Sequence, residues 1–148
     1  MNKIESFKID HTKLASGFYV SRIDGDITTY DMRCKKPNTV PLLTNSEMHS
    51  FEHMFATMIR NGSIADKVIY FGPMGCQTGF YLLVRNSEHG ETILEIKKAL
   101  DEILKHEGEV FGNGEKECGN YKNLDLDDAK KVAQEYKIIL KELDVYPE

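Results

Sequence analysis

The sequence predicts a single α+β domain in which an antiparallel β-sheet has helices packed on one face. Three observations support this class. β-Prone segments come in hairpin-like pairs, amphipathic segments with helical spacing lie between and after them, and no linker or internal repeat divides the 148 residues. This length suits one domain with a buried core, so we expect residues 1–148 to form one unit.

The first elements along the chain are a hairpin and a helix. The segments GFYVSRI and ITTYDMR flank an Asp-Gly-Asp turn, which predicts a hairpin over residues 17–33. A helix is expected to begin at Thr44, because Thr44 and Glu47 have the spacing of a capping box, and to end at Asn61-Gly62. Its apolar stripe contains Phe51 and Phe55.

A second strand pair and two helices follow. KVIYFG and GFYLLVR predict strands joined by the loop PMGCQT. Apolar spacing predicts a helix over residues 90–106 and another whose apolar positions run from Ala129 to Leu143. Between these helices lies a polar, glycine-rich connection that contains Cys118.

Charge and hydropathy exclude several partners. The 24 acidic residues outnumber the 19 Lys and Arg, for a formal net charge of −5, so a surface that tracks nucleic-acid phosphates is not expected. No apolar run reaches the roughly 20 residues that span a bilayer, and the start MNKIESFKIDH lacks the apolar segment of a secretory signal. We therefore expect a cytoplasmic protein with no membrane partner.

The stretch HSFEH lies within the first predicted amphipathic helix. On a helix, His49 and His53 lie one turn apart on one side, close enough to share a metal ion, with Glu52 beside them. This edge points away from the centre of the apolar stripe, so burial of one helix face does not explain it. A pair of partly exposed surface histidines is the alternative interpretation.

The three cysteines are too few and too widely spaced for a disulfide framework. Cys118 is poorly explained as a core residue in its polar loop, and its thiolate would complete a His2Cys site with one open position. Cys76 is either a packed cysteine after a tight turn or a proton-transfer group near a bound cation. Cys34 is interpreted as structural or incidental.

His-x-x-Glu-His is also the signature of inverzincin metallopeptidases. Such enzymes need a peptide-binding cleft, for which 148 residues leave little chain, and Cys76 and Cys118 would have no role. A metallopeptidase and a non-catalytic, zinc-stabilised binding module remain alternatives to other metal-dependent catalysis.

Taken together, these motifs resemble the S-ribosylhomocysteine lyase family, whose members make the precursor of the quorum-sensing signal autoinducer-2. The resemblance extends from about Glu5 to the last helix and is carried, in the family's order, by ESFKIDH, YDMRCKKPN, HSFEH, GPMGCQTGFYLLV and KECGNY. It implies cleavage of S-ribosylhomocysteine to homocysteine and 4,5-dihydroxy-2,3-pentanedione, by carbonyl migration along the ribose and β-elimination of the thiol.

The resemblance also implies roles for particular residues. His49, His53 and Cys118 bind one divalent metal per subunit, Fe(II) in the family's native form, which Zn(II) or Co(II) can replace. Glu52 and Cys76 form the general acid/base pair.

Substrate contacts and assembly follow from the same resemblance. The family's substrate contacts fall on Ser6, His11, Arg33 and the backbone around Met74 and Gly75. The family forms homodimers whose sheets pack together, with the active sites at the interface, and the partner would cover the histidine edge of the helix. Two departures from the family stand out: the hairpin is shorter than in many relatives, and Tyr70 replaces an acidic residue that helps hold the substrate's amino group.

Overall fold

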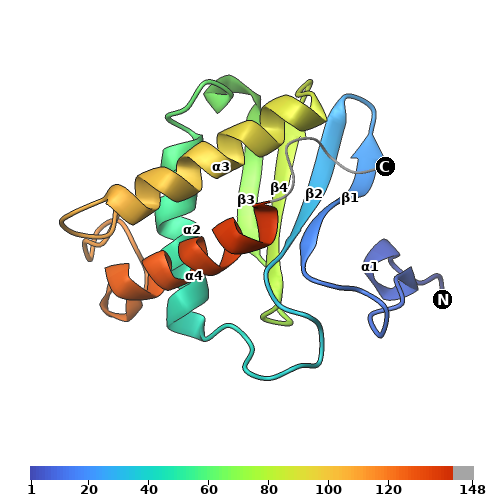
Figure 1. The fold of residues 1–148 in the computed structure, drawn as a ribbon, viewed down its shortest axis with the longest axis horizontal. Coiled ribbons are helices and arrows are strands. Elements are labelled where there is room, and N and C mark those ends of the chain that lie inside the picture. The colour runs from blue at the N-terminus through green and yellow to red at the C-terminus, as the bar shows by residue number, and fades with distance from the viewer. Residues whose placement is uncertain (142–148) are drawn as a thin grey trace.

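The computed structural model describes residues 1–141, with the side chains of Glu5 and Ser6 left aside. Its centre is a four-stranded antiparallel sheet in the order β1-β2-β4-β3 (Figure 1). The strands are β1 (Gly17–Asp24), β2 (Ile27–Arg33), β3 (Val68–Pro73) and β4 (Gly79–Arg85). Both predicted hairpins are confirmed, and β2 pairs with β4 to join them.

Three long helices accompany the sheet. They are α2 (Asn45–Ile59), α3 (His89–Lys105) and α4 (Leu126–Leu140), and each contacts the other two. Figure 1 shows α3 and α4 crossing in front of the sheet. The predicted single domain with helices on one face of an antiparallel sheet therefore matches the described residues.

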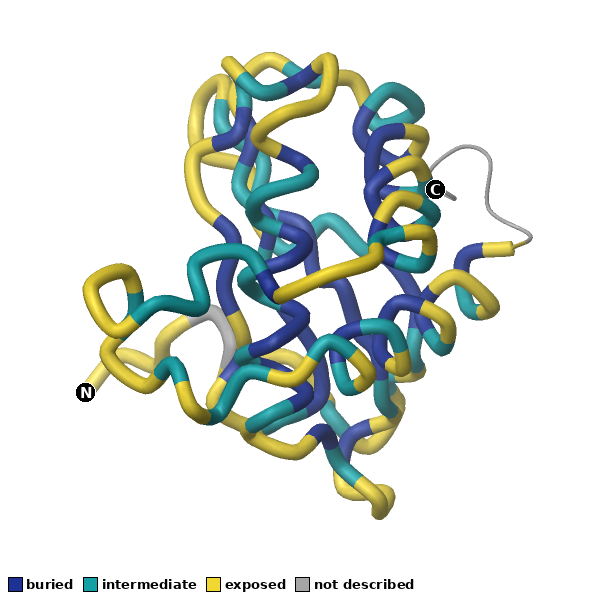
Figure 2. The backbone as a smooth tube through the Cα atoms, turned by 90° about the vertical axis from the view of Figure 1, so that its left-hand side faces the viewer, coloured by how far each residue is buried: buried dark blue, intermediate teal, exposed yellow. Residues whose placement is uncertain are grey.

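The core lies between the helices and one face of the sheet. Tyr30 and Met32 on β2 point to this side, and their neighbours across the β2–β4 ladder, Leu82 and Phe80, are also fully buried. Phe80 stacks on Phe71 of β3 and packs against the ring of Phe51 on α2. Figure 2 shows the buried backbone concentrated in the strands and on the inner sides of the helices.

The opposite face of the sheet is polar and aromatic. Strand alternation places Asp31 and Arg33 there, together with Tyr81 on β4. Tyr70 on β3 pairs with Leu83 on the same face and is 51% exposed. In the described residues no helix longer than one turn lies over this face.

The ends of the elements follow local signals. Thr44 and Glu47 form the predicted capping box: Glu47 N donates to Thr44 Oγ1 at 3.1 Å, and Thr44 N donates to Glu47 Oε1 at 2.8 Å. The first hairpin turns at Gly25, whose φ of +62° is a conformation that glycine adopts without strain. Leu143, expected to belong to the last helix, lies outside the described residues.

Three short helices were not predicted. They are α1 (Glu5–Lys8) and the 3-10 turns Ala65–Lys67 and Tyr121–Asn123. Each has only three or four residues, which is too short for a hydrophobic period to appear.

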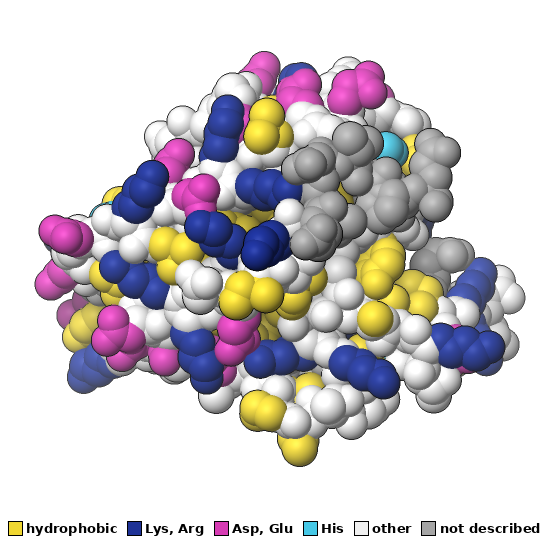
Figure 3. All heavy atoms as spheres, viewed as in Figure 1, with side chains coloured by type: hydrophobic (Ala, Val, Ile, Leu, Met, Phe, Trp, Pro, Cys, Tyr) yellow, Lys and Arg dark blue, Asp and Glu magenta, His cyan; other side chains and the backbone are white. Residues whose placement is uncertain are grey.

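The helix-covered side of the molecule has a mixed surface. Figure 3 shows lysine and arginine side chains interspersed with aspartate and glutamate, as expected for the solvent sides of amphipathic helices. Among the described residues, no helix is both long enough and apolar enough to cross a bilayer.

Candidate active site

The predicted metal ligands come together. His49 and His53 project from α2 with perpendicular rings whose centroids are 4.7 Å apart. Cys118 approaches them from the α3–α4 connection, with its Sγ 3.3 Å from His49 Nε2. Ligand atoms of these three residues all lie within 4.8 Å of one another, so the structure brings together residues that are 69 positions apart in the sequence.

The outer nitrogen of each ring has a partner. His53 Nδ1 lies 2.9 Å from the main-chain oxygen of Phe111, and His49 Nδ1 lies 2.8 Å from Asn123 Oδ1. Both partners are oxygen acceptors, so both Nδ1 atoms donate, and Nε2 is the nitrogen of each ring that is left for a metal. Two imidazole nitrogens and a sulfur in this state suit a divalent transition metal.

The α3–α4 connection is shaped to deliver Cys118. A turn closes where Cys118 N donates to Gly114 O at 3.1 Å, and Asn120 N donates to Cys118 Sγ at 3.4 Å. Gly112, with φ +67°, lies against the ring of His53: a Cβ at this position would come within 3.2 Å of His53 Nδ1. Gly112 and Cys118 of the same chain therefore lie against the histidine edge of α2.

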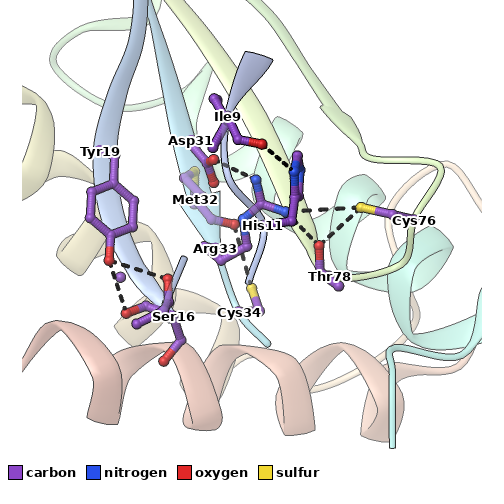
Figure 4. Close-up of polar contacts among 12 residues, drawn as sticks. Ile9, His11, Ser16, Tyr19, Asp31, Met32, Arg33, Cys34, Cys76 and Thr78 are labelled. Carbon is purple, nitrogen blue, oxygen red and sulfur yellow. Dashed lines mark hydrogen bonds and ion pairs between the residues drawn. The ribbon is translucent and has the colours of Figure 1, made fainter. Parts of the chain in front are cut away.

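A second cluster surrounds Cys76 in the middle of the β3–β4 loop. Arg33 is buried and donates from Nη1 to Thr78 Oγ1 at 2.6 Å, while Thr78 Oγ1 lies 3.0 Å from Cys76 Sγ. Arg33 Nη1 is itself 3.9 Å from that sulfur. Figure 4 shows Arg33 between Asp31 on one side and Thr78 and Cys76 on the other, with His11 beside it. The guanidinium of Arg33 and the hydroxyl of Thr78 therefore both lie near the sulfur of Cys76.

The ion pair behind Cys76 is almost fully buried. Arg33 Nη2 donates to Asp31 Oδ2 at 2.6 Å, and the two side chains are 2% and 4% exposed. Burial raises the pKa of Asp31, and this effect outweighs the lowering by Arg33. Asp31 Oδ1 and Arg33 Nε have no hydrogen-bond partner among the described residues.

Most of the predicted substrate contacts line one cavity. Its volume is about 550 Å³, and its walls include His11, Arg33, Met74, Gly75 and Cys76. His11 Nδ1 lies 2.9 Å from the main-chain oxygen of Ile9. The side chain of Ser6, the remaining predicted contact, is outside the described parts of the chain.

The cavity and the histidines are neighbours. A smaller hollow of about 280 Å³ is lined by His49 and Glu52, and Pro73 lines both spaces. Cys76 is exposed and Glu52 is half-buried, so both side chains are accessible. The structure therefore places Glu52 and Cys76 in adjoining spaces, which the sequence alone could not do.

Several residues around the site carry no sequence signal. Asn123 and Thr78 look like ordinary loop and strand residues, and Asp31 is recognisable only from its i, i+2 relation to Arg33 on one strand face. The interpretation of Cys34 as structural agrees with its position, since it is 5% exposed and burial raises the pKa of its thiol far above the ordinary range.

Comparisons with known proteins identify the family of the chain. The model of the S-ribosylhomocysteinase (LuxS) family matches residues 4–144. Similar curated proteins, each named S-ribosylhomocysteine lyase, include one from Finegoldia magna, 45% identical with all of both chains covered. Another, from Borreliella afzelii, is 44% identical over 95% of this chain and 93% of its own. A third, from Desulfotalea psychrophila, is 44% identical over 92% of this chain and 89% of its own. With matches of this extent, the chain belongs to the S-ribosylhomocysteinase (LuxS) family.

Proposed function

We propose that this protein is a metal-dependent lyase that cleaves S-ribosylhomocysteine to homocysteine and 4,5-dihydroxy-2,3-pentanedione. The observation that carries the proposal is the convergence of His49, His53 and Cys118 beside a cavity that presents Cys76. Family membership supplies the substrate, and the site supplies groups suited to the reaction. A zinc-stabilised binding module would explain the three ligands but gives no role to the accessible Cys76 and Glu52.

The chemistry requires several proton transfers. A divalent ion held by His49, His53 and Cys118 would act as a Lewis acid on the carbonyl and hydroxyl oxygens of the ribose. Moving the carbonyl from C1 to C3 takes protons from C2 and then C3 and returns them to C1 and then C2. Removal of the C4 proton next to the C3 carbonyl then forms the C4–C5 double bond and expels homocysteine thiolate from C5.

Glu52 and Cys76 are the groups we assign to these transfers. Each has one acidic proton, and each lies in a space open to a ligand, on either side of Pro73. Arg33 Nη1 lies 3.9 Å from the Cys76 sulfur, so a positive charge stands beside the proposed proton-transfer group. In this assignment His11 and Arg33, with the backbone at Met74 and Gly75, line the space for the substrate, and Ser6 contributes from the N-terminal segment.

We assign Fe(II) as the native metal, with Zn(II) or Co(II) as substitutes. Imidazole nitrogen and thiolate sulfur accept all three ions, so the ligand set is compatible with each. The cytoplasm, where thiols stay reduced, suits three free cysteines, two of which have proposed roles in the site.

The direct test of the activity is thiol release from S-ribosylhomocysteine. Protein prepared without oxygen and loaded with Fe(II) or Co(II) is expected to release one homocysteine per substrate, whereas His53→Ala serves as the blank because it removes a ligand. Homocysteine is measured after the protein is filtered off, since exposed Cys76 would react with a thiol reagent. A parent protein that contains metal but releases no homocysteine would refute the lyase assignment and leave the binding module.

We also propose that the protein is a homodimer whose sheets pack together, with residues of both subunits at each active site. The sheet face that carries Asp31 and Arg33 exposes Tyr70, and the N-terminal segment exposes Ile4 and Phe7 to 59% and 71%. Apolar side chains that lack cover within one chain favour an interface. On the same face lie Asp31 Oδ1 and Arg33 Nε, which are buried and have no hydrogen-bond partner within residues 1–141 as described.

Analytical ultracentrifugation tests the assembly. The parent is expected to sediment at twice the chain mass of 16.9 kDa. Leu83 lies on the same sheet face as Tyr70. Leu83→Asp should shift the protein toward the monomer and lower thiol release, because the new charge would be buried between the two sheets. Ile138→Asp, on the solvent side of α4, is the matched control and should remain a dimer. A fully active monomeric parent would exclude the proposed interface.

A further inference from the structure

The two histidine ligands are held by different kinds of acceptor. His53 Nδ1 bonds to the main-chain oxygen of Phe111. This oxygen is present whichever amino acid occupies position 111. His49 Nδ1 bonds to a side-chain oxygen, Asn123 Oδ1, at 2.8 Å. Only the second contact depends on the identity of the residue.

Asn123 is fixed independently of its contact with His49. Its main-chain N donates to Asn120 O at 3.2 Å, and its main-chain O accepts from Ser46 Oγ at 3.0 Å. Two positions later, Asp125 N donates to Ser50 Oγ at 2.8 Å. Ser46 and Ser50 lie on α2 on either side of His49 in the sequence, so the segment is fastened to the helix that presents the ligand.

The hydrogen bond to Asn123 Oδ1 determines which ring nitrogen of His49 points toward Cys118 and the metal position. An amide oxygen only accepts, so Nδ1 must carry the proton, and the lone pair of the neutral ring lies on Nε2. Nε2 is the nitrogen that lies 3.3 Å from Cys118 Sγ. A ring of the other tautomer would present an N–H to the metal position.

We propose that Asn123 is a positioning residue of the metal centre, holding His49 in the tautomer and orientation that leave Nε2 free to bind a divalent transition metal. The inference rests on the proposed metal site and adds to it a residue outside the ligand set. Acceptors of this kind typically change metal affinity by about 10- to 100-fold when removed.

The test is metal affinity. Asn123→Leu keeps nearly the same shape without an acceptor, and Asn123→Asp keeps the acceptor. Each purified variant competes with a chromophoric chelator for Zn(II). We expect the dissociation constant to rise about 10- to 100-fold in Asn123→Leu and to stay within a few-fold of the parent in Asn123→Asp. Asn113→Leu is the matched control in the same connection, because its amide bonds to Glu109, and should bind as the parent does.

A spectroscopic readout separates positioning from a general loss of structure. With saturating Co(II), the sulfur-to-metal charge-transfer band should persist in Asn123→Leu because Cys118 is intact, whereas the ligand-field bands should shift as the His49 ring turns. Thermal melting of the metal-free variants shows whether the fold is retained, as the main-chain contacts of residue 123 lead us to expect.

The outcomes are distinct from those of the proposed function. If the parent and Asn123→Leu bind Zn(II) equally and give the same Co(II) spectrum, the role of Asn123 is excluded while the lyase assignment stands. If Asn123→Asp weakens binding as much as Asn123→Leu, the acceptor is not the cause and the proposal is likewise overturned. A parent that binds no metal overturns both the inference and the metal site on which it rests.

Discussion

Cys76→Ala is expected to lower kcat for thiol release by about 10²- to 10⁴-fold, the usual contribution of a general acid or base, with unchanged metal content. The cysteine is exposed in a cavity rather than packed, and its sulfur lies 3.0 Å from Thr78 Oγ1 and 3.9 Å from Arg33 Nη1. It is not one of the three grouped ligands, so its loss should leave the metal in place. The measurement is steady-state homocysteine release together with metal analysis of the same sample.

Hydrogen exchange at the substrate carbons can show which proton transfers depend on Cys76 and which on Glu52. Glu52→Gln keeps the shape of the side chain and removes its basicity, so a loss of similar size is expected. If each residue serves different transfers, one variant should still exchange substrate carbon-bound hydrogen with D2O while it releases no homocysteine. Nuclear magnetic resonance of the recovered substrate reports that exchange.

Cys34→Ala is the matched control for loss of a cysteine. Cys34 is buried in the core and lies outside the proposed machinery, so its replacement should affect stability more than turnover. Full turnover in Cys76→Ala would remove Cys76 from the reaction, and the cavity would then serve substrate binding alone.

Most of the fold could be predicted because its signals are local. The capping box at Thr44 and Glu47 and the glycine turn at Gly25 each act within a few residues, and both form as expected. Helical and strand periodicity located the long elements to within a few residues. Short elements such as Tyr121–Asn123 lie below the length at which periodicity can be detected.

The candidate site was predictable to a smaller extent. The spacing of His49 and His53 is a helical pattern, and Cys118 was identified because its polar loop offers no core in which a cysteine would pack. Asn123 and the carbonyl of Phe111 could not be found in this way, since their roles depend on how a loop lies against α2. Likewise, the sequence does not reveal that Arg33 on β2 donates a hydrogen bond to Thr78, the last residue of the β3–β4 loop. This contact depends on the pairing of β2 with β4.

The pair Arg33–Asp31 gives the largest expected effect on stability. Arg33→Met should lower the free energy of unfolding by about 3–5 kcal/mol, because it leaves the carboxylate of Asp31 buried without its cation. Arg33→Met combined with Asp31→Leu should recover most of that loss, since two apolar side chains then replace the ion pair. Urea unfolding at a fixed protein concentration measures both.

A matched exposed pair on the same sheet sets the scale. Arg85 Nη1 lies 2.7 Å from Asp26 Oδ1, the same type of contact, but the side chains are 52% and 44% exposed. Arg85→Met should therefore cost no more than about 1 kcal/mol. An equal loss in Arg85→Met and Arg33→Met would show that burial is not the cause.

The pH dependence of unfolding identifies the carboxylate responsible. Burial raises the pKa of Asp31 in the folded protein above its ordinary value of 3.8. For a group whose pKa rises on folding, the stabilising contribution is complete below the unfolded pKa and is lost as pH increases through the folded pKa. In Arg33→Met this pKa should rise further, so the destabilisation should be small at acidic pH and grow toward neutrality.

In the Arg33→Met/Asp31→Leu double variant that pH dependence of stability should disappear. Homocysteine release should stay low, because the arginine that faces Thr78 and Cys76 is gone. Recovery of turnover along with stability would mean that Arg33 serves the fold alone.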